Sequence, residues 1–313
     1  MLGKTAGGLF WMFRYLERCE NNARLIDAGF RIALTRSATA KSEWKSILTT
    51  AGSLADYDDR HDDYSSAEVV DFMLRDPTNP SSVISTMKQA RDNARLVRTA
   101  LTREVWEATN ESWMTLKQIL AAPVAEQDLP DVLASIRRMS AQVRGATAGT
   151  MLRNDVFNFI RLGTFIERAD NTARILDVKY YLLLPSIAQV GSAIDVMQWE
   201  TILRTVSAQR AYRWLNGAEI SPSNIAEFLI LYSKMPRSLI FCSQKISDNL
   251  GYLEQDYGVS LASHEAAKAS TQRLRKASID QIFDQGLHEF IQEFTAQNSR
   301  LAAQIEHDYR FLE

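Results

Sequence analysis

Apolar residues recur at intervals of three and four along almost the whole chain, and strict alternation is rare. That spacing gathers apolar side chains on one side of an α-helix, whereas a half-buried strand needs alternation. The chain also holds only 13 glycines and 7 prolines among 313 residues, roughly half of the usual share. The sequence therefore predicts an all-α fold, a multi-helix bundle, and argues against all-β and collagen-like chains.

Two long helices dominate this prediction, at about residues 5–36 and 157–184. Residues 222–313 are expected to form a C-terminal helical extension of the same bundle. The offset of about 150 residues between the two long helices suggests two related halves whose helices interleave in one bundle, so we expect a single helical domain over residues 1–313.

Pairs of a capping residue and a proline mark two expected helix starts. Asn79 precedes Pro80, and Ser221 precedes Pro222. Asn and Ser are good N-cap residues, and proline is favoured at the first helical position. We therefore expect a helix to begin at Pro80 and another at Pro222.

One segment of the first predicted helix recurs 150 residues later. Residues 15–27 read YLERCENNARLID, and residues 165–177 read FIERADNTARILD. Six positions are identical, and both copies keep an acidic residue, Glu20 or Asp170. A weaker third copy at residues 90–96 keeps Asn-Ala-Arg but not the glutamate. The sequence thus predicts an internal pseudo-repeat of glutamate-bearing helices.

Helical spacing divides the first copy into an apolar side and a polar side. The apolar stripe consists of Met12, Leu16, Cys19, Ala23, Ile26 and Phe30. The polar side matches its second copy as closely as the apolar side does, although a solvated face would tolerate exchange of Lys for Arg. This match favours a Glu/Arg/Asn network at a cleft or interface between two packed helices. The candidate binding residues are Arg14, Glu17, Arg18, Glu20, Asn21, Arg24, Glu167, Arg168, Asp170, Asn171 and Arg174.

Several interpretations of these residues stay open. They can form a solvated face with ion pairs one turn apart, a network that fixes helix register, or a site for a charged ligand. Two carboxylates one turn apart also occur in di-iron bundles, but those sites use Glu-x-x-His on two helices. No histidine lies near either copy, and an arginine adjoins each first glutamate. We therefore expect neither a metal nor another cofactor.

Composition restricts the remaining classes. A net charge of −2 argues against nucleic-acid binding by bulk charge. The two cysteines, Cys19 and Cys242, form no C-x-x-C motif, which suits a reducing compartment. Cys19 lies on the apolar stripe, so a buried inert thiol is expected there. No apolar run approaches the roughly 20 residues of a membrane-spanning helix. We expect a cytoplasmic protein.

Four blocks of the chain resemble bacterial alpha-E domain proteins, a helical family. The blocks read LFWMFRYLERCENNARLID, NPSSVISTMKQARDNARLVRTALTREVWEATNESW, FIRLGTFIERADNTARILDVKYYLL and WETILRTVSAQRAY. Cys19 and Asn22 depart from the family pattern, which favours Ala and Thr there. The resemblance implies a helical bundle that accompanies ATP-grasp-type ligases and transglutaminase-like peptidases. It also implies a setting in peptide or amide-bond chemistry, with a small peptide as a ligand.

Three hypotheses of function follow. In the first, the chain is an accessory or binding protein that serves an ATP-grasp-type ligase. In the second, it is an enzyme in which Glu17 or Glu167 is the general base and Arg24 or Arg174 holds a carboxylate or phosphate. In the third, it is a structural or oligomerising helical protein, and a homo-oligomer is compatible with the pattern.

Overall fold

The computed structural model describes residues 1–35, 40–182, 193–217 and 219–312. Every regular element in these ranges is a helix, so the fold is all-α as predicted. Two short 3₁₀ turns, η2 (Arg98–Ala100) and η3 (Glu126–Asp128), accompany the α-helices. The α-helices are α1 (Gly3–Thr35), α2 (Ala40–Ala51), α3 (Leu54–Asp58), α4 (Ser66–Leu74), α5 (Val83–Leu96), α6 (Arg103–Ile119), α7 (Leu129–Thr150), α8 (Asp155–Leu182), α9 (Ala193–Thr205), α10 (Gln209–Asn216), α11 (Pro222–Ile230), α12 (Leu239–Tyr257), α13 (Ala262–Lys276), α14 (Ile279–Gln285) and α15 (Leu287–Asp308).

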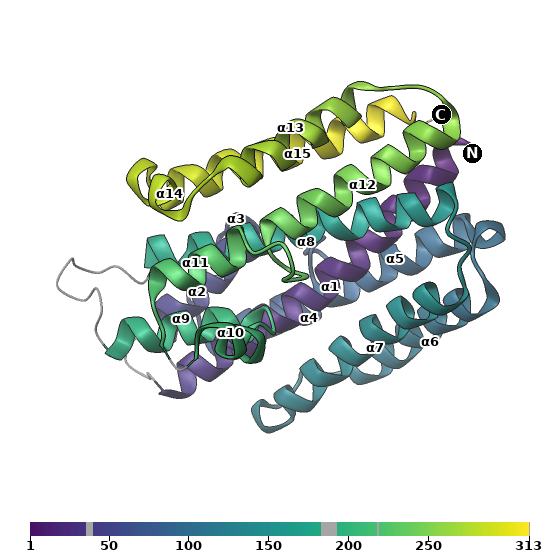
Figure 1. Cartoon of the computed structure of the whole chain (residues 1–313). Helices are drawn as coiled ribbons and strands as arrows, with labels where there is room; N and C mark the ends of the chain where they lie inside the picture. The colour runs from purple at the N-terminus through teal and green to yellow at the C-terminus, as the bar shows by residue number, and fades with distance from the viewer. Residues whose placement is uncertain (36–39, 183–192, 218, 313) are drawn as a thin grey trace.

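The long helices stack in paired layers (Figure 1). Helices α13 and α15 form one outer layer, α8 and α12 the next, α1 and α5 the third, and α6 and α7 the other outer layer. Helix α12, from the expected C-terminal extension, therefore packs in the inner part of the bundle against α8. The internal repeat and the single domain over residues 1–313 stay predictions.

The two long helices of the prediction are α1 and α8, although residues 36, 183 and 184 lie outside the described ranges. All six residues of the predicted apolar stripe on α1 are buried. Helix α1 is also covered on its polar side, because α5, α7 and α8 pack around it. The polar residues of the repeated segment must therefore find partners inside the protein.

The structure confirms one of the two expected helix starts. Ser221 is the N-cap of α11, with its hydroxyl oxygen accepting from the Asn224 amide at 3.4 Å. Pro222 occupies the first helical position, where the absent N–H leaves no carbonyl unpaired.

The expected start at Asn79–Pro80 is wrong. Helix α5 begins at Val83, and its N-cap is Ser82, whose Oγ accepts from the Ser85 amide at 3.2 Å. The Asn79 side chain instead donates to the Phe72 carbonyl oxygen at 3.2 Å and so closes the turn after α4. Asn79 and Ser82 are both suitable N-cap residues. The bond of Asn79 to the end of α4 leaves Ser82 as the cap of α5.

Helices α1 and α8 approach each other closely at Gly163. A Cβ atom on Gly163 would overlap the carbonyl oxygen of Phe10, a backbone atom of α1 that cannot rotate away. Only glycine permits this interhelical distance. The position of Gly163 therefore helps to set how near the polar side chains of the two helices come.

The variant Gly163→Ala is expected to lower the free energy of unfolding by about 1–3 kcal/mol, as overpacking typically does. The matched control is Gly145→Ala on α7, where an added Cβ meets nothing within 4 Å. Gly145→Ala should raise the free energy of unfolding by up to about 1 kcal/mol, because alanine has a higher helix propensity than glycine. Urea unfolding of both variants measures the difference, and equal gains in stability would show that α1 and α8 are not in tight contact.

Candidate functional site

The repeated Glu-Arg dipeptides bind each other across the α1–α8 interface. Arg18 donates to Glu167 through Nε, at 2.6 Å from Oε1, and through Nη2, at 3.0 Å from Oε2. Arg168 donates to Glu17 in the same way, with distances of 2.8 and 3.0 Å. Each carboxylate thus receives a two-pronged guanidinium from the other helix, the strongest geometry for such a pair. We call Glu17–Arg168 and Glu167–Arg18 the reciprocal pairs.

Both glutamates of the reciprocal pairs are buried, at 2 and 4% exposure for Glu17 and Glu167. Burial would raise the pKa of Glu17, but Arg168, Arg237 and Arg144 together hold it well below its usual range. Burial would likewise raise the pKa of Glu167, and Arg18 and Arg14 lower it instead. Both side chains are therefore carboxylates at neutral pH, and the interpretation as a solvated face does not hold for them.

Glu20, one turn after Glu17, forms ion pairs with three further arginines. Arg24 donates to Glu20 through Nε and Nη2, at 3.0 and 2.6 Å. Arg144 of α7 also contacts Glu20 through Nη1. Arg237, in the loop before α12, donates to Glu20 at 3.0 Å and to Glu17 at 3.1 Å. We call the group the Glu20 cluster, and its members are Glu17, Glu20, Asn21, Arg24, Arg144, Arg168 and Arg237.

The second copy of the repeated segment has a simpler environment. Arg14 donates to Glu167 at 3.0 Å, and its guanidinium lies 4.5 Å from the centre of the Trp11 ring. Arg174 donates to Asp170 at 2.7 Å, in a partly exposed pair one turn apart on α8. The two copies therefore share the reciprocal pairs and an ion pair one turn apart, but Asp170 lacks the additional arginines that surround Glu20.

The last aspartate of each copy joins an inner helix to an outer one. Asp27 accepts from Arg137 of α7, with Oδ2 and Nη1 at 3.2 Å. Asp177 contacts Nδ1 of His288 on α15 at 2.6 Å and accepts from Gln292 at 2.8 Å. These bonds tie the outer layers to α1 and α8.

The structure brings most of the predicted residues into one network. Arg14, Arg18, Arg168, Glu17 and Glu167 meet at the α1–α8 interface. Asn21 and Asn171 are buried as well, and within the described part of the chain each keeps one polar atom without a hydrogen-bond partner, Nδ2 of Asn21 and Oδ1 of Asn171. Asp170 and Arg174 pair with each other at the edge of the network.

Sequence reasoning missed Arg144 and Arg237, which complete the Glu20 cluster. Arg144 lies in α7, where no repeated motif marks it. Arg237 carries one usable signal. The tripeptides before α5 and α12 are similar, Pro80-Ser81-Ser82 and Pro236-Arg237-Ser238, and each ends with the serine that caps the helix. The middle residue is Ser81 in the first and Arg237 in the second.

The pKa values of the carboxylates and thiols near the network are poorly matched to proton transfer or nucleophilic attack. A general base needs a pKa near the working pH, whereas Glu17, Glu20 and Glu167 all have a lowered pKa. Burial raises the pKa of Cys19 and of Cys242 to about 12, so neither is a thiolate nucleophile. In the described ranges, no group of three His, Cys, Asp or Glu side chains could hold a metal ion.

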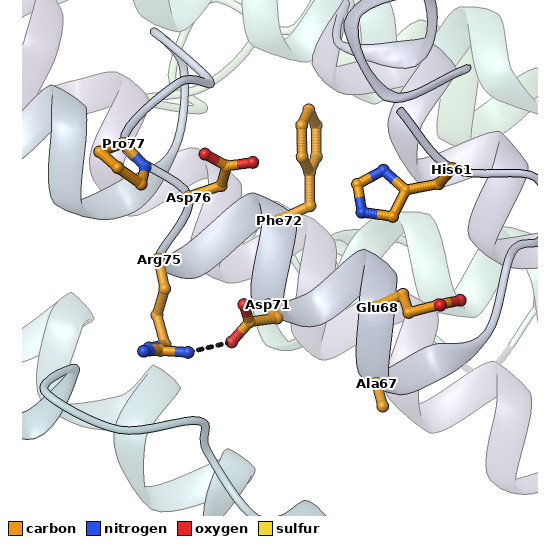
Figure 2. Close-up of a pocket in the computed structure, with 8 residues that line it drawn as sticks. All are labelled: His61, Ala67, Glu68, Asp71, Phe72, Arg75, Asp76 and Pro77. Carbon is orange, nitrogen blue, oxygen red and sulfur yellow. Dashed lines mark hydrogen bonds and ion pairs between the residues drawn. The ribbon is translucent and has the colours of Figure 1, made fainter. Parts of the chain in front are cut away.

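A second place that could take a ligand is a hollow of about 470 Å³ beside α4 (Figure 2). Glu68, Asp71 and Asp76 line it together with His61 and Arg75. Arg75 is already bound to Asp71 at 2.5 Å, and Glu68 accepts from the hydroxyl of Ser65 at 2.7 Å. Its charged groups are thus used in local contacts, and the reciprocal pairs and the Glu20 cluster remain the stronger candidate.

The fold and the site define an all-helical bundle held together by Glu-Arg pairs between two central helices. The chain belongs to the Alpha-E family, described as a predicted alpha-helical domain with a conserved ER motif, and the family model matches residues 1–310. The chain contains the Glu-Arg dipeptide at residues 17–18 and again at 167–168, and these residues form the reciprocal pairs.

Relatives of known sequence include uncharacterised proteins of Mycobacterium bovis and Mycobacterium tuberculosis, which are 25% identical over 304 residues. The match covers 89% of this chain and 33% of each relative, so the chain spans about a third of their length. No solved structure matches the chain significantly. None of the described helices has a stretch both long enough and apolar enough to cross a bilayer.

Removing one partner of a reciprocal pair should cost much more stability than removing a surface charge. Glu167→Gln leaves Arg14 and Arg18 without their carboxylate, and the expected loss is about 3–5 kcal/mol. The matched control is Glu107→Gln, whose pair with Arg103 is exposed and should be worth less than about 1 kcal/mol. Denaturant unfolding measures both, and a small loss for Glu167→Gln would mean that the pair does not hold the helices.

At acidic pH, the wild type should no longer be more stable than Glu167→Gln. The folded-state pKa of Glu167 is lowered, so its contribution is complete above the unfolded value of about 4.3 and is lost as pH falls through the folded value. The difference in free energy of unfolding should thus be largest near pH 7 and shrink below about pH 4. Urea titrations at a series of pH values test this. If the difference in free energy of unfolding grew on acidification, the pKa of Glu167 would be raised in the folded state and the assignment would be wrong.

Proposed function

We propose that the chain is a helical accessory or binding module that serves an ATP-grasp-type peptide or amide ligase, together with a transglutaminase-like protein. The observation that carries the proposal is the length of the mycobacterial relatives. In them the matching region makes up a third of the polypeptide. A region that shares its chain with about twice its own length of other protein is expected to contact and assist that protein.

The type of partner comes from the resemblance to alpha-E domain proteins. The chemistry of the network suits such a role, because arginine forks bind carboxylates and phosphates, and an ATP-dependent ligase handles both groups. A small peptide with its carboxylate is the corresponding ligand. The two buried, unpaired cysteines fit a reducing cytoplasmic setting for this work.

A second candidate function is structural, and the reciprocal pairs favour it. Buried ion pairs that match only in one register specify how two helices align. In this alternative the polar network fixes the bundle or an assembly of copies and binds nothing else. The enzyme hypothesis has less support, because the lowered pKa values make Glu17 and Glu167 weak bases.

Co-purification with a ligase tests the accessory role. The full chain, carrying an affinity tag, is expressed with an ATP-grasp-type ligase encoded in the same genome, and the eluted material is assayed for ATP-dependent amide-bond formation. We expect the ligase to co-elute and its activity to depend on the chain. A ligase that is fully active alone and never co-elutes would contradict the proposal.

The double variant Glu17→Gln/Glu167→Gln separates the accessory role from the structural one. If the network serves the partner, the variant should bind the ligase less tightly even under conditions where it remains folded. If the network is only structural, a folded variant should bind the ligase as the wild type does, and only its melting temperature should fall. Glu107→Gln is the surface control and should change neither.

A further inference from the structure

The Glu20 cluster carries more positive charge than its carboxylates balance. In the described part of the chain, four arginines, Arg24, Arg144, Arg168 and Arg237, contact only two carboxylates, Glu17 and Glu20. All six groups lie in the interior or at its edge, where water screens charge poorly. The geometry points to an oxyanion site at this cluster, for the carboxylate or phosphate group of a ligand. The inference rests on the proposed binding role of the network and names the ligand class.

An unused donor supports the site. Asn21 is 2% exposed, and its Oδ1 accepts from Nη1 of Arg237 at 3.2 Å. Its Nδ2 is buried and has no hydrogen-bond partner among the residues that the structure describes. A buried donor without an acceptor costs about 1–3 kcal/mol, and the donor lies on the amide that Arg237 contacts. An oxyanion supplies both the missing acceptor and the missing negative charge.

Arg237 shows the same imbalance. Burial, together with Arg168 and Arg24, lowers the pKa of this guanidinium to about 10 against the pull of Glu17 and Glu20. A further negative charge in contact with the cluster would relieve this repulsion. Arginine also has the right shape, because its planar fork binds two oxygens of one carboxylate or phosphate.

The cluster reaches solvent through Arg144 and Arg24. The Arg144 side chain is 30% exposed, and in the described ranges only its Nη1 has a protein partner, so Nε and Nη2 stay available to a ligand. Nη1 of Arg24 donates to the hydroxyl of Ser207 at 2.5 Å. Ser207 has a φ of 55°, a left-handed conformation unusual for serine, and such strained residues gather at binding sites.

The other half of the α1–α8 interface lacks this excess. There Glu167 forms ion pairs with Arg14 and Arg18. Glu306 lies near enough to Arg14 for the positive charge of Arg14 to act on its carboxyl group. In sequence, Ser81 precedes the N-cap serine of α5 as Arg237 precedes the N-cap serine of α12, so this half has a neutral serine in place of the arginine, and the Ser81 carbonyl oxygen accepts from Asn22 at 2.6 Å. The site is therefore expected at Glu20 and not at Asp170.

Calorimetric titration of the full chain with inorganic phosphate, and separately with acetate, tests the site. Sodium chloride keeps the ionic strength constant, so that a general salt effect is removed. We expect saturable binding of at least one of the two anions. Binding of phosphate alone assigns a phosphate group as the ligand, and binding of acetate assigns a carboxylate.

Two variants on α7 locate the binding. Arg144→Gln removes a cluster arginine and should weaken binding about tenfold, the effect expected for one lost charge-assisted hydrogen bond. Arg137→Gln is the matched control, because Arg137 also pairs with a carboxylate of α1 and its side chain is 27% exposed. It should bind as the wild type does. Asn21→Asp replaces the free donor with a carboxylate and should abolish binding in the folded protein.

Absence of heat with both anions would overturn the inference, and so would equal affinity of the Arg144→Gln, Arg137→Gln and wild-type proteins. If Asn21→Asp does not fold, the comparison of the two α7 variants decides. A chain that co-purifies with its ligase but binds no anion would refute this site and leave the accessory role intact. A chain that binds phosphate or acetate but no ligase would support this site and contradict the accessory role.

Discussion

Two carboxylates buried between the central helices set the geometry on which the rest of the bundle depends. Glu17 and Glu167 each need a guanidinium from the opposite helix, because a buried charge without a partner is strongly destabilising. A shift of α1 against α8 by one residue would turn Glu17 and Arg18 by about 100° and separate them from Arg168 and Glu167. The close approach at Gly163 brings the side chains within reach. The outer helices α7 and α15 then bind the same two helices through Asp27 and Asp177.

Much of the fold follows from the sequence, because local patterns carry it. The three- and four-residue spacing predicts an all-α chain, and the duplicated segment identifies α1 and α8 and the residues that meet between them. The burial of the polar side of α1 does not follow from its pattern, since amphipathicity cannot show that α5, α7 and α8 cover the helix from several sides. Arg144 and Arg237 come from a helix and a loop without the motif, and only tertiary packing brings them to Glu20. The start of α5 at Val83 is decided in the same way, by the contact of Asn79 with the turn after α4.

The two halves of the interface combine a shared element with an unequal one. The reciprocal pairs hold the helices and leave carboxylates of low basicity, which suits binding and positioning better than proton transfer. The Glu20 cluster adds arginines beyond the number its carboxylates need, and it lies where Arg144 and Ser207 meet solvent. The chain belongs to the Alpha-E family, and it spans about a third of the length of the mycobacterial relatives it matches. A helical module that presents an oxyanion site to a ligase is consistent with each of these features.

The claim that the reciprocal pairs fix the two central helices is tested most directly by a double-mutant cycle on Glu17 and Arg168. The free energy of unfolding is measured for the wild type, Glu17→Gln, Arg168→Gln and the double variant. Because the pair is bidentate and buried, we predict a coupling free energy of at least about 1.5 kcal/mol. Additive losses, with a coupling below about 0.5 kcal/mol, would show that the two residues act independently and would contradict the account.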